Sequence, residues 1–116
     1  MKKEYRLRKN RDFKIAISKR QSFSNSSFVL YYAANNLNKI RVGISCSSKI
    51  GNAVVRNKTK RQVRMMCQAL FDKADSFDFV IIIRKGYTNK NFEQNKDELN
   101  YLYSKFKKKG NNHKDY

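Results

Sequence analysis

Apolar residues recur along the chain with two spacings, and these spacings divide it into helices and strands. A spacing of three to four residues is typical of a helix with one buried face, and it marks residues 10–19, 52–71 and 92–106. Alternation, or a short continuous apolar run, is typical of a strand, and it marks residues 28–33, 40–46 and 79–83. The polar stretch at residues 21–26 leaves room for one more short strand.

This order predicts a single α+β domain over residues 1–116, an α/β sandwich with one mixed sheet of about four strands. Its elements follow one another as helix, strand, strand, strand, helix, strand, helix. Residues 40–46 are expected to pair antiparallel with residues 28–33, and the apolar run at 79–83 is expected to be buried on both faces. Asn10 and Asn52 stand where helix caps are preferred. At the ends of the chain we expect a mobile basic arm at residues 1–9 and a frayed basic tail at residues 107–116.

The charge of the chain predicts an anionic partner. Twenty-seven Lys and Arg face nine Asp and Glu, and this net charge of +18 destabilises a compact state by self-repulsion. No carboxylate occurs between Phe13 and Phe71, whereas eleven Lys and Arg do. Nucleic acid is the first class of partner that this balance indicates, and an anionic membrane surface is the second.

The helix predicted at residues 52–71 has two faces of different chemistry. At about 100° per residue, one stripe is apolar and suits the core, and it consists of Val55, Thr59, Val63, Met66 and Leu70. The adjoining stripe is polar and cationic, with Lys58 away from both, and it consists of Arg56, Asn57, Lys60, Arg61 and Arg64. No acidic residue stands three or four positions away to offset the repulsion. A merely solvated face normally mixes signs, so this stripe favours contacts with phosphates and nucleotides.

Phe13 and Ile17 leave two interpretations open. They lie on one face of the first predicted helix and can simply belong to the core. Together with Tyr31 they can instead line a groove in which a single-stranded base stacks. The pattern of residues alone does not decide between these.

Several other classes of function are disfavoured. Cys46 and Cys67 have the spacing of neither a disulfide framework nor a metal site, and they are expected to be core thiols in a reducing cytosol. The longest apolar run is too short to span a bilayer, and no secretory signal follows the basic start. A protein-only nuclease needs clustered carboxylates for Mg²⁺. The cluster of Asp72, Asp75 and Asp78 falls in a predicted loop away from the basic face, where we expect it to be solvated.

Five blocks of sequence together resemble the protein subunit of bacterial ribonuclease P. In chain order they are LRKNRDF, SFVLYY, RVGISCSSK, GNAVVRNKTKRQVR and VIIIRKG, within residues 5–106. The resemblance implies a basic subunit of a ribonucleoprotein that removes the 5′ leader from precursor tRNA. The RNA subunit would carry the catalysis with Mg²⁺, so the protein would hold neither catalytic residues nor a metal of its own. It also implies a left-handed β-α-β crossover, against the general right-handed rule, and a cytoplasmic location with no membrane or small-molecule partner.

The same resemblance assigns roles to residues. The ribonuclease P RNA would be contacted by Lys49, Asn52, Arg56, Asn57, Lys58, Lys60, Arg61 and Arg64. The leader would lie in a cleft formed by Phe13, Ile17 and Tyr31. Three positions depart from the family pattern, because Lys58 replaces an arginine, Ser48 stands where a second lysine is usual, and Ile17 replaces an aromatic residue. The rival function in the same class is a ribosomal or other structural RNA-binding protein, and the rival from another class is a peripheral membrane protein.

Overall fold

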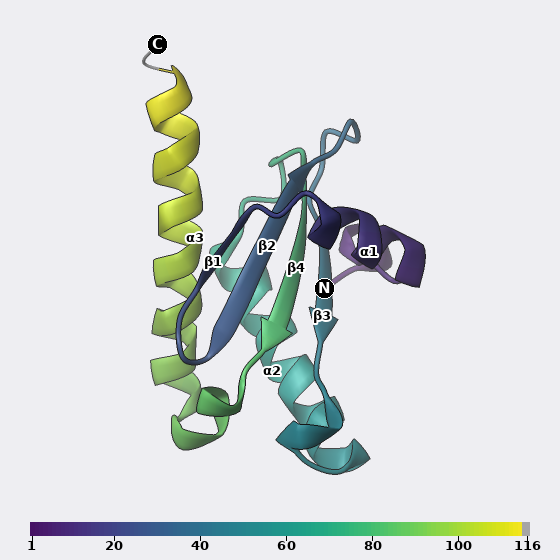
Figure 1. Cartoon of the computed structure of the whole chain (residues 1–116), viewed down its shortest axis with the longest axis vertical. Coiled ribbons are helices and arrows are strands. Elements are labelled where there is room, and N and C mark those ends of the chain that lie inside the picture. The colour runs from purple at the N-terminus through teal and green to yellow at the C-terminus, as the bar shows by residue number, and fades with distance from the viewer. Residues whose placement is uncertain (115–116) are drawn as a thin grey trace.

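The computed structural model describes the backbone of residues 1–114 and the side chains of residues 1–109. The helices and strands are α1 (Asn10–Ser18), β1 (Ser22–Ser24), β2 (Phe28–Ala34), β3 (Arg41–Ser45), α2 (Ala53–Leu70), β4 (Phe77–Ile83) and α3 (Phe92–Lys114). Short 3₁₀ helices lie at Lys3–Tyr5, Ser48–Ile50 and Lys85–Asn89. The elements therefore occur in the predicted order, and the polar stretch after α1 does contain a short strand (Figure 1).

The strands form one mixed sheet in the order β1-β2-β4-β3. β4 pairs antiparallel with β2, where Leu30 lies opposite Ile81, and parallel with β3, where Ile44 lies opposite the same Ile81. The predicted antiparallel pairing of residues 28–33 with 40–46 is therefore wrong. The continuous apolar run of β4 is the reason, because a strand buried on both faces is most stable at the centre, with a neighbour on each edge.

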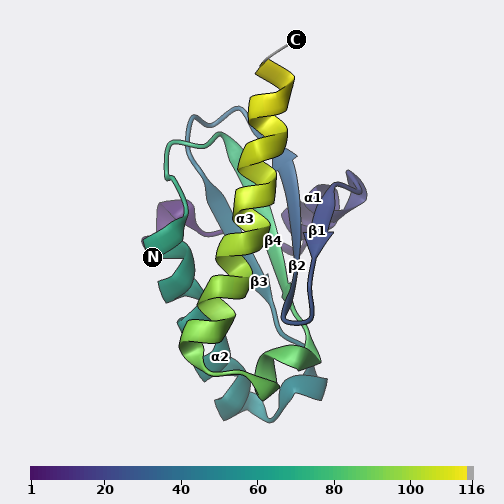
Figure 2. The ribbon, with the colours of Figure 1, turned by 90° about the vertical axis from the view of Figure 1, so that its left-hand side faces the viewer.

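The β3-α2-β4 unit has a left-handed crossover, as the family resemblance implied. In Figure 1 both strands point downward, β3 lies to the right of β4, and α2 passes behind the sheet. In the side view of Figure 2, α1 and α2 lie on opposite sides of the sheet, which places α2 behind it in Figure 1. This arrangement brings the basic helix beside β3 at one edge of the sheet, away from β1 at the other edge.

The two faces of the sheet are covered to different extents. α2 and α3 pack on one face, over a large core that includes the fully buried Phe28, Leu30, Phe79 and Ile81. α1 packs on the other face over a smaller cluster of Leu7, Ala16, Ala33 and Val80. Because α1 has only nine residues, it covers only part of this face. The result is the predicted sandwich, with one side left partly open.

The N-terminal segment expected to be a mobile arm is packed on the sheet. Lys3–Tyr5 form a 3₁₀ helix, and Leu7 is only 3% exposed. The Leu7 N–H donates a hydrogen bond to the Val42 carbonyl at 2.9 Å, next to a parallel bridge between Arg6 and Val42. Burial of a single apolar side chain thus fixes residues 6–8 along the edge of β3.

The C-terminal segment expected to be a frayed tail continues α3 to Lys114. Within it, the Lys107 ammonium lies 2.8 Å from an Asp75 oxygen, and Lys109 Nζ lies 2.9 Å from the Tyr32 hydroxyl. Residues 115–116 of the predicted tail lie outside the described residues.

Two other local predictions are corrected. Asn10 does not cap α1, because the helix begins at Asn10 itself and its N-cap, Lys9, makes no side-chain capping bond. Asp78 is not solvated, because it lies in β4 and accepts hydrogen bonds from Arg41 Nε at 2.9 Å and Nη2 at 2.7 Å. Asp75 likewise accepts a hydrogen bond from the Tyr103 hydroxyl at 2.7 Å. Only Asp72, with its side chain 58% exposed, faces solvent as expected.

Candidate RNA-binding surface

The cations of α2 form a continuous stripe without acidic partners. Arg56, Lys60 and Arg64 lie one turn apart and are partly exposed, Asn57 and Arg61 beside them are exposed, and so is Lys58 farther round the helix. Across the described residues, the cations that form ion pairs with carboxylates are Lys39, Arg41 and Lys107. The charge of the α2 stripe is therefore available to an external anion.

The start of α2 is held by its own cap. The Asn52 side chain accepts a hydrogen bond from the Val55 N–H at 3.0 Å, which confirms the predicted N-cap. Asn52 is thus engaged within the helix, and its predicted RNA contact stays a prediction. Lys49 lies just before this cap, exposed in the 3₁₀ helix Ser48–Ile50.

The adjoining apolar stripe of α2 enters the core for most of its length. Thr59, Val63 and Met66 are buried, as predicted, and Cys67 joins them. Val55 is 42% exposed instead, because the first turn of α2 extends below the ends of the strands (Figure 1). The core contact of α2 thus begins one turn later than the pattern of residues indicated.

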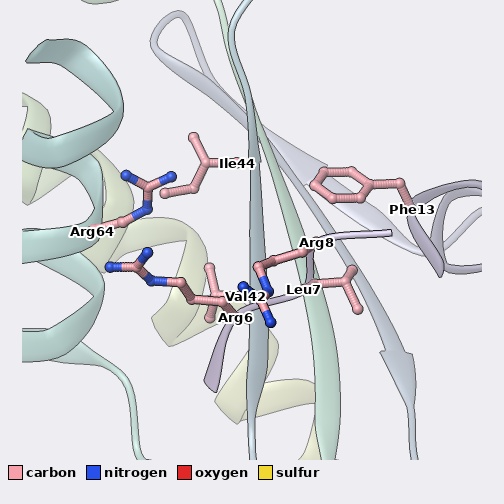
Figure 3. A pocket seen from close by; sticks show the side chains of 7 residues that line it. All are labelled: Arg6, Leu7, Arg8, Phe13, Val42, Ile44 and Arg64. Carbon is pink, nitrogen blue, oxygen red and sulfur yellow. The ribbon is translucent and has the colours of Figure 1, made fainter. Parts of the chain in front are cut away.

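A hollow between α2, β3 and α1 lies beside the stripe. It has a volume of about 200 Å³ and is lined by Arg6, Leu7, Arg8, Phe13, Val42, Ile44 and Arg64. Figure 3 shows Arg6 and Arg64 side by side between α2 and β3, with the Phe13 ring pointing toward the sheet from α1. Partial burial and the nearby Arg6 charge lower the pKa of Arg64 from its ordinary value. Two guanidinium groups held this close make the hollow strongly attractive to an anion.

This hollow continues across the open face of the sheet. A second hollow shares Arg8, Phe13 and Ile44 with the first, and adds Asn10, Lys14, Ile17, Ser45, Cys46 and Lys60. A third shares Lys14 and Ile17 with the second, and adds Ser18, Arg20, Ser22 and Tyr31. Together they form one channel from α2 to β1, here named the α1 groove, and no carboxylate lines it.

The α1 groove brings together the three residues predicted for the leader cleft. Phe13, Ile17 and Tyr31 all line it, and each is partly buried against the smaller core cluster. One side of each residue therefore packs inward and another faces the groove, and the stacking of a base on these residues stays a prediction. Two residues of the α2 stripe, Lys60 and Arg64, also line it.

Sequence reasoning missed the cations on the other wall of the groove, namely Arg6, Arg8, Lys14 and Arg20. Arg6 and Arg8 were assigned to a mobile arm, so no position could be given to them. The signal that could have found them is the alternation of Arg6, Leu7 and Arg8, which places one apolar side chain inward and two cations outward.

Both cysteines are free thiols. Burial raises the pKa of Cys67 to about 12, so this thiol is protonated at neutral pH. Burial also raises the pKa of Cys46 at the groove wall, although the charges of Lys60 and Arg56 act in the opposite direction. Among the side chains of residues 1–109, no three His, Cys, Asp or Glu gather as metal ligands do. Within residues 1–114, no helix is long and apolar enough to cross a membrane.

Comparison with known proteins identifies the family. A family model described as Ribonuclease P matches residues 1–107. The chain belongs to the ribonuclease P protein family. The ribonuclease P protein component of Mesoplasma florum is 44% identical over 110 residues, which cover 93% of this chain and 100% of that protein. The ribonuclease P protein component of Streptococcus pneumoniae is 41% identical over 114 residues, 96% of this chain and 93% of the relative.

Solved structures of ribonuclease P proteins share the fold. The protein from Staphylococcus aureus has a TM-score of 0.80 at 34% identity, covering 86% of this chain and 93% of that one. The protein from Thermotoga maritima has a TM-score of 0.72 at 33% identity, covering 84% and 94%. Family membership gives the chain the role of protein subunit in ribonuclease P, a ribonucleoprotein endonuclease of tRNA processing, in which the RNA subunit carries the catalysis and is the protein's partner. A ribosomal function is not favoured.

Proposed function

We propose that the α1 groove binds the single-stranded 5′ leader of precursor tRNA while the α2 stripe binds the phosphates of the ribonuclease P RNA. The groove has the two components that hold single-stranded RNA without reading its sequence. Phe13 and Tyr31 offer aromatic rings to bases, and Arg8, Lys14 and Arg20 offer charge to the backbone. Ile17 offers an aliphatic surface in place of a third ring.

The continuity of the two surfaces carries this proposal. Lys60 and Arg64 belong to the α2 stripe and also line the α1 groove. An RNA bound along the stripe and a strand lying in the groove would therefore meet at the same two side chains. This arrangement suits a subunit that holds a substrate strand next to the catalytic RNA.

The residues of this chain contribute charge and positioning rather than bond cleavage. Magnesium ions bound by the RNA subunit would supply the nucleophile activation and charge stabilisation that phosphodiester cleavage needs. The protein's unpaired cations would neutralise neighbouring phosphates, a task that otherwise falls to counterions. We therefore expect the protein to lower the Mg²⁺ concentration at which the RNA subunit cleaves. A cytoplasmic location belongs to this proposal as well.

The test is cleavage of a precursor tRNA by a cognate ribonuclease P RNA at low, near-physiological Mg²⁺. Adding the protein is expected to restore 5′-leader removal. The Phe13→Ala variant is expected to bind precursor tRNA more weakly, while its affinity for mature tRNA, which lacks the leader, stays unchanged. Equal weakening for both tRNAs would show that the leader does not lie in the groove. A failure to restore cleavage would contradict the role of the α2 stripe.

A further inference from the structure

The edge of the sheet farthest from α2 carries a second aromatic and cationic surface. The Lys105 ammonium lies 5.0 Å from the ring centroid of Tyr101 and 5.9 Å from that of Phe23, both within the range of a cation–π interaction. The Tyr101 ring belongs to a residue that is 56% exposed. We name Phe23, Tyr101 and Lys105 the β1–α3 patch.

The charge of this patch suits a polyanion. From residue 99 to residue 109, α3 carries four lysines and no carboxylate. Lys107 is paired with Asp72 and Asp75, whereas Lys105, Lys108 and Lys109 form no ion pair with any described carboxylate. Asp97 and Glu98 stand one turn before Tyr101 on the same side of α3, so the cationic part of this side begins at Tyr101.

The patch also adjoins the end of the α1 groove. Ser22 lines the groove where it reaches Tyr31, and these two residues are paired between β1 and β2. Phe23 is the next residue of β1, so its side chain points to the other face of the sheet, toward α3. Figure 1 shows β1 alongside α3 at this edge. An RNA chain that leaves the groove at Ser22 therefore reaches the patch after passing around β1 alone.

We propose that the β1–α3 patch is a second binding site for single-stranded RNA, which takes the nucleotides of the leader that extend beyond the α1 groove. This inference rests on the proposed function, because the groove must hold the leader for its far end to reach β1. The exposed ring of Tyr101 provides a stacking surface for a base. Lys105, Lys108 and Lys109 provide charge for the adjoining phosphates.

Leader length separates this site from the groove. We would measure the affinity of the reconstituted holoenzyme for precursor tRNAs whose leaders lengthen one nucleotide at a time. Tyr101→Ala and Lys105→Ala are expected to match the wild type with short leaders. Beyond a threshold length they are expected to bind about fivefold more weakly, as for the loss of one stacked base. Lys96→Ala is the matched control, because Lys96 lies about 180° from Lys105 around α3.

The Phe13→Ala variant keeps the two proposals apart. It is expected to lose affinity for short and long leaders alike, since the groove holds the nearer nucleotides. If Phe13→Ala has no effect on leader binding, the proposed function fails. If Phe13→Ala acts but Tyr101→Ala and Lys105→Ala show no loss at any length, or a loss that does not depend on length, the β1–α3 patch is not a leader site. Melting temperatures equal to the wild type would show that the exposed substitutions leave the fold intact.

Discussion

The ring of Phe13 lies against the backbone of Gly43, so closely that a Cβ added at Gly43 would come within 2.8 Å of the ring atom Cε1. Phe13 belongs to α1 and Gly43 to β3, so this contact sets how near the helix comes to the sheet. The absence of a side chain at residue 43 thereby fixes the position of an aromatic ring in the α1 groove.

Gly43→Ala is expected to displace the Phe13 ring and to weaken the binding of single-stranded RNA. Overpacking of this kind costs about 1–3 kcal/mol of stability. In a Gly43→Ala/Phe13→Ala double variant the clash disappears, so the two losses in RNA affinity should not add. RNA titrations and thermal melts of the two single variants and the double variant would measure this, and strictly additive losses would show that Gly43 acts elsewhere.

Arg56→Ala is expected to weaken binding to the ribonuclease P RNA while changing stability by no more than about 0.5 kcal/mol, as for a surface site. If Arg56 neutralises one phosphate, the slope of log K against log salt should fall by about one. Titrations at several salt concentrations, beside thermal melts, would test both parts. Lys96→Ala serves as a control of equal charge on a different helix. A destabilised Arg56→Ala protein with an unchanged salt slope would make Arg56 structural.

Two asparagines at the start of α2 are expected to separate stability from binding. Asn52 caps the helix, so Asn52→Ala should lower the free energy of unfolding by about 1 kcal/mol. Asn57 is exposed within the cationic stripe, so Asn57→Ala should leave stability unchanged and weaken RNA binding. Urea unfolding and RNA titration of both variants would show the contrast. The reverse result would mean that Asn57 supports the helix and Asn52 contacts RNA.

Cys67 is expected to make stability fall at alkaline pH. Its pKa rises from 9.0 to about 12 on folding, because the thiolate would be desolvated. The folded protein therefore keeps the proton of the thiol, whereas the unfolded chain loses it above pH 9. The contribution of the protonated thiol to the free energy of unfolding is thus intact below pH 9 and is lost as the pH rises toward 12. By pH 10 the loss should be about 1 kcal/mol.

Urea unfolding at several pH values between 8 and 10 would test this, since the raised pKa values of Tyr87 and Tyr103 act mainly above their ordinary value of 10. Cys67→Ala should be less stable at every pH but should show a shallower decline. Cys46 also has a raised pKa, so part of the decline should remain. If the free energy of unfolding falls equally with pH in the wild type and in Cys67→Ala, groups other than Cys67 cause the loss of stability.

The kinds and order of the elements could be predicted from the sequence because each depends on local spacing. The partner of each strand could not be predicted in this way, since alternation assigns the faces of residues 40–46 but not the neighbour at either edge. Asp78 was misjudged for a similar reason. Its burial depends on Arg41, which is 37 positions away in sequence and donates a hydrogen bond from Nη2 to Asp78 Oδ2 at 2.7 Å.

The candidate site also has one part that depends on local spacing and one part that depends on contacts between distant segments. The α2 stripe could be predicted residue by residue, because it lies on one helix. The α1 groove could not be outlined from patterns, because its walls come from the N-terminal segment, α1, β1, β2, β3 and α2. The pattern of residues offered the grouping of Phe13, Ile17 and Tyr31 only as one of two alternatives, and the family resemblance favoured it.

The position of β4 also sets when this surface first exists during synthesis. β4 is the last strand to be translated, yet it stands between β2 and β3 and is the partner of both. Before residues 77–83 leave the ribosome, Tyr31 of β2 and Ile44 of β3 have no common framework, so a nascent chain has no groove. Pairing between segments so distant in sequence is slow to form. The basic segment at residues 49–64 is thus translated before the sheet that positions it can be completed, and we expect specific RNA binding only after β4 has been made.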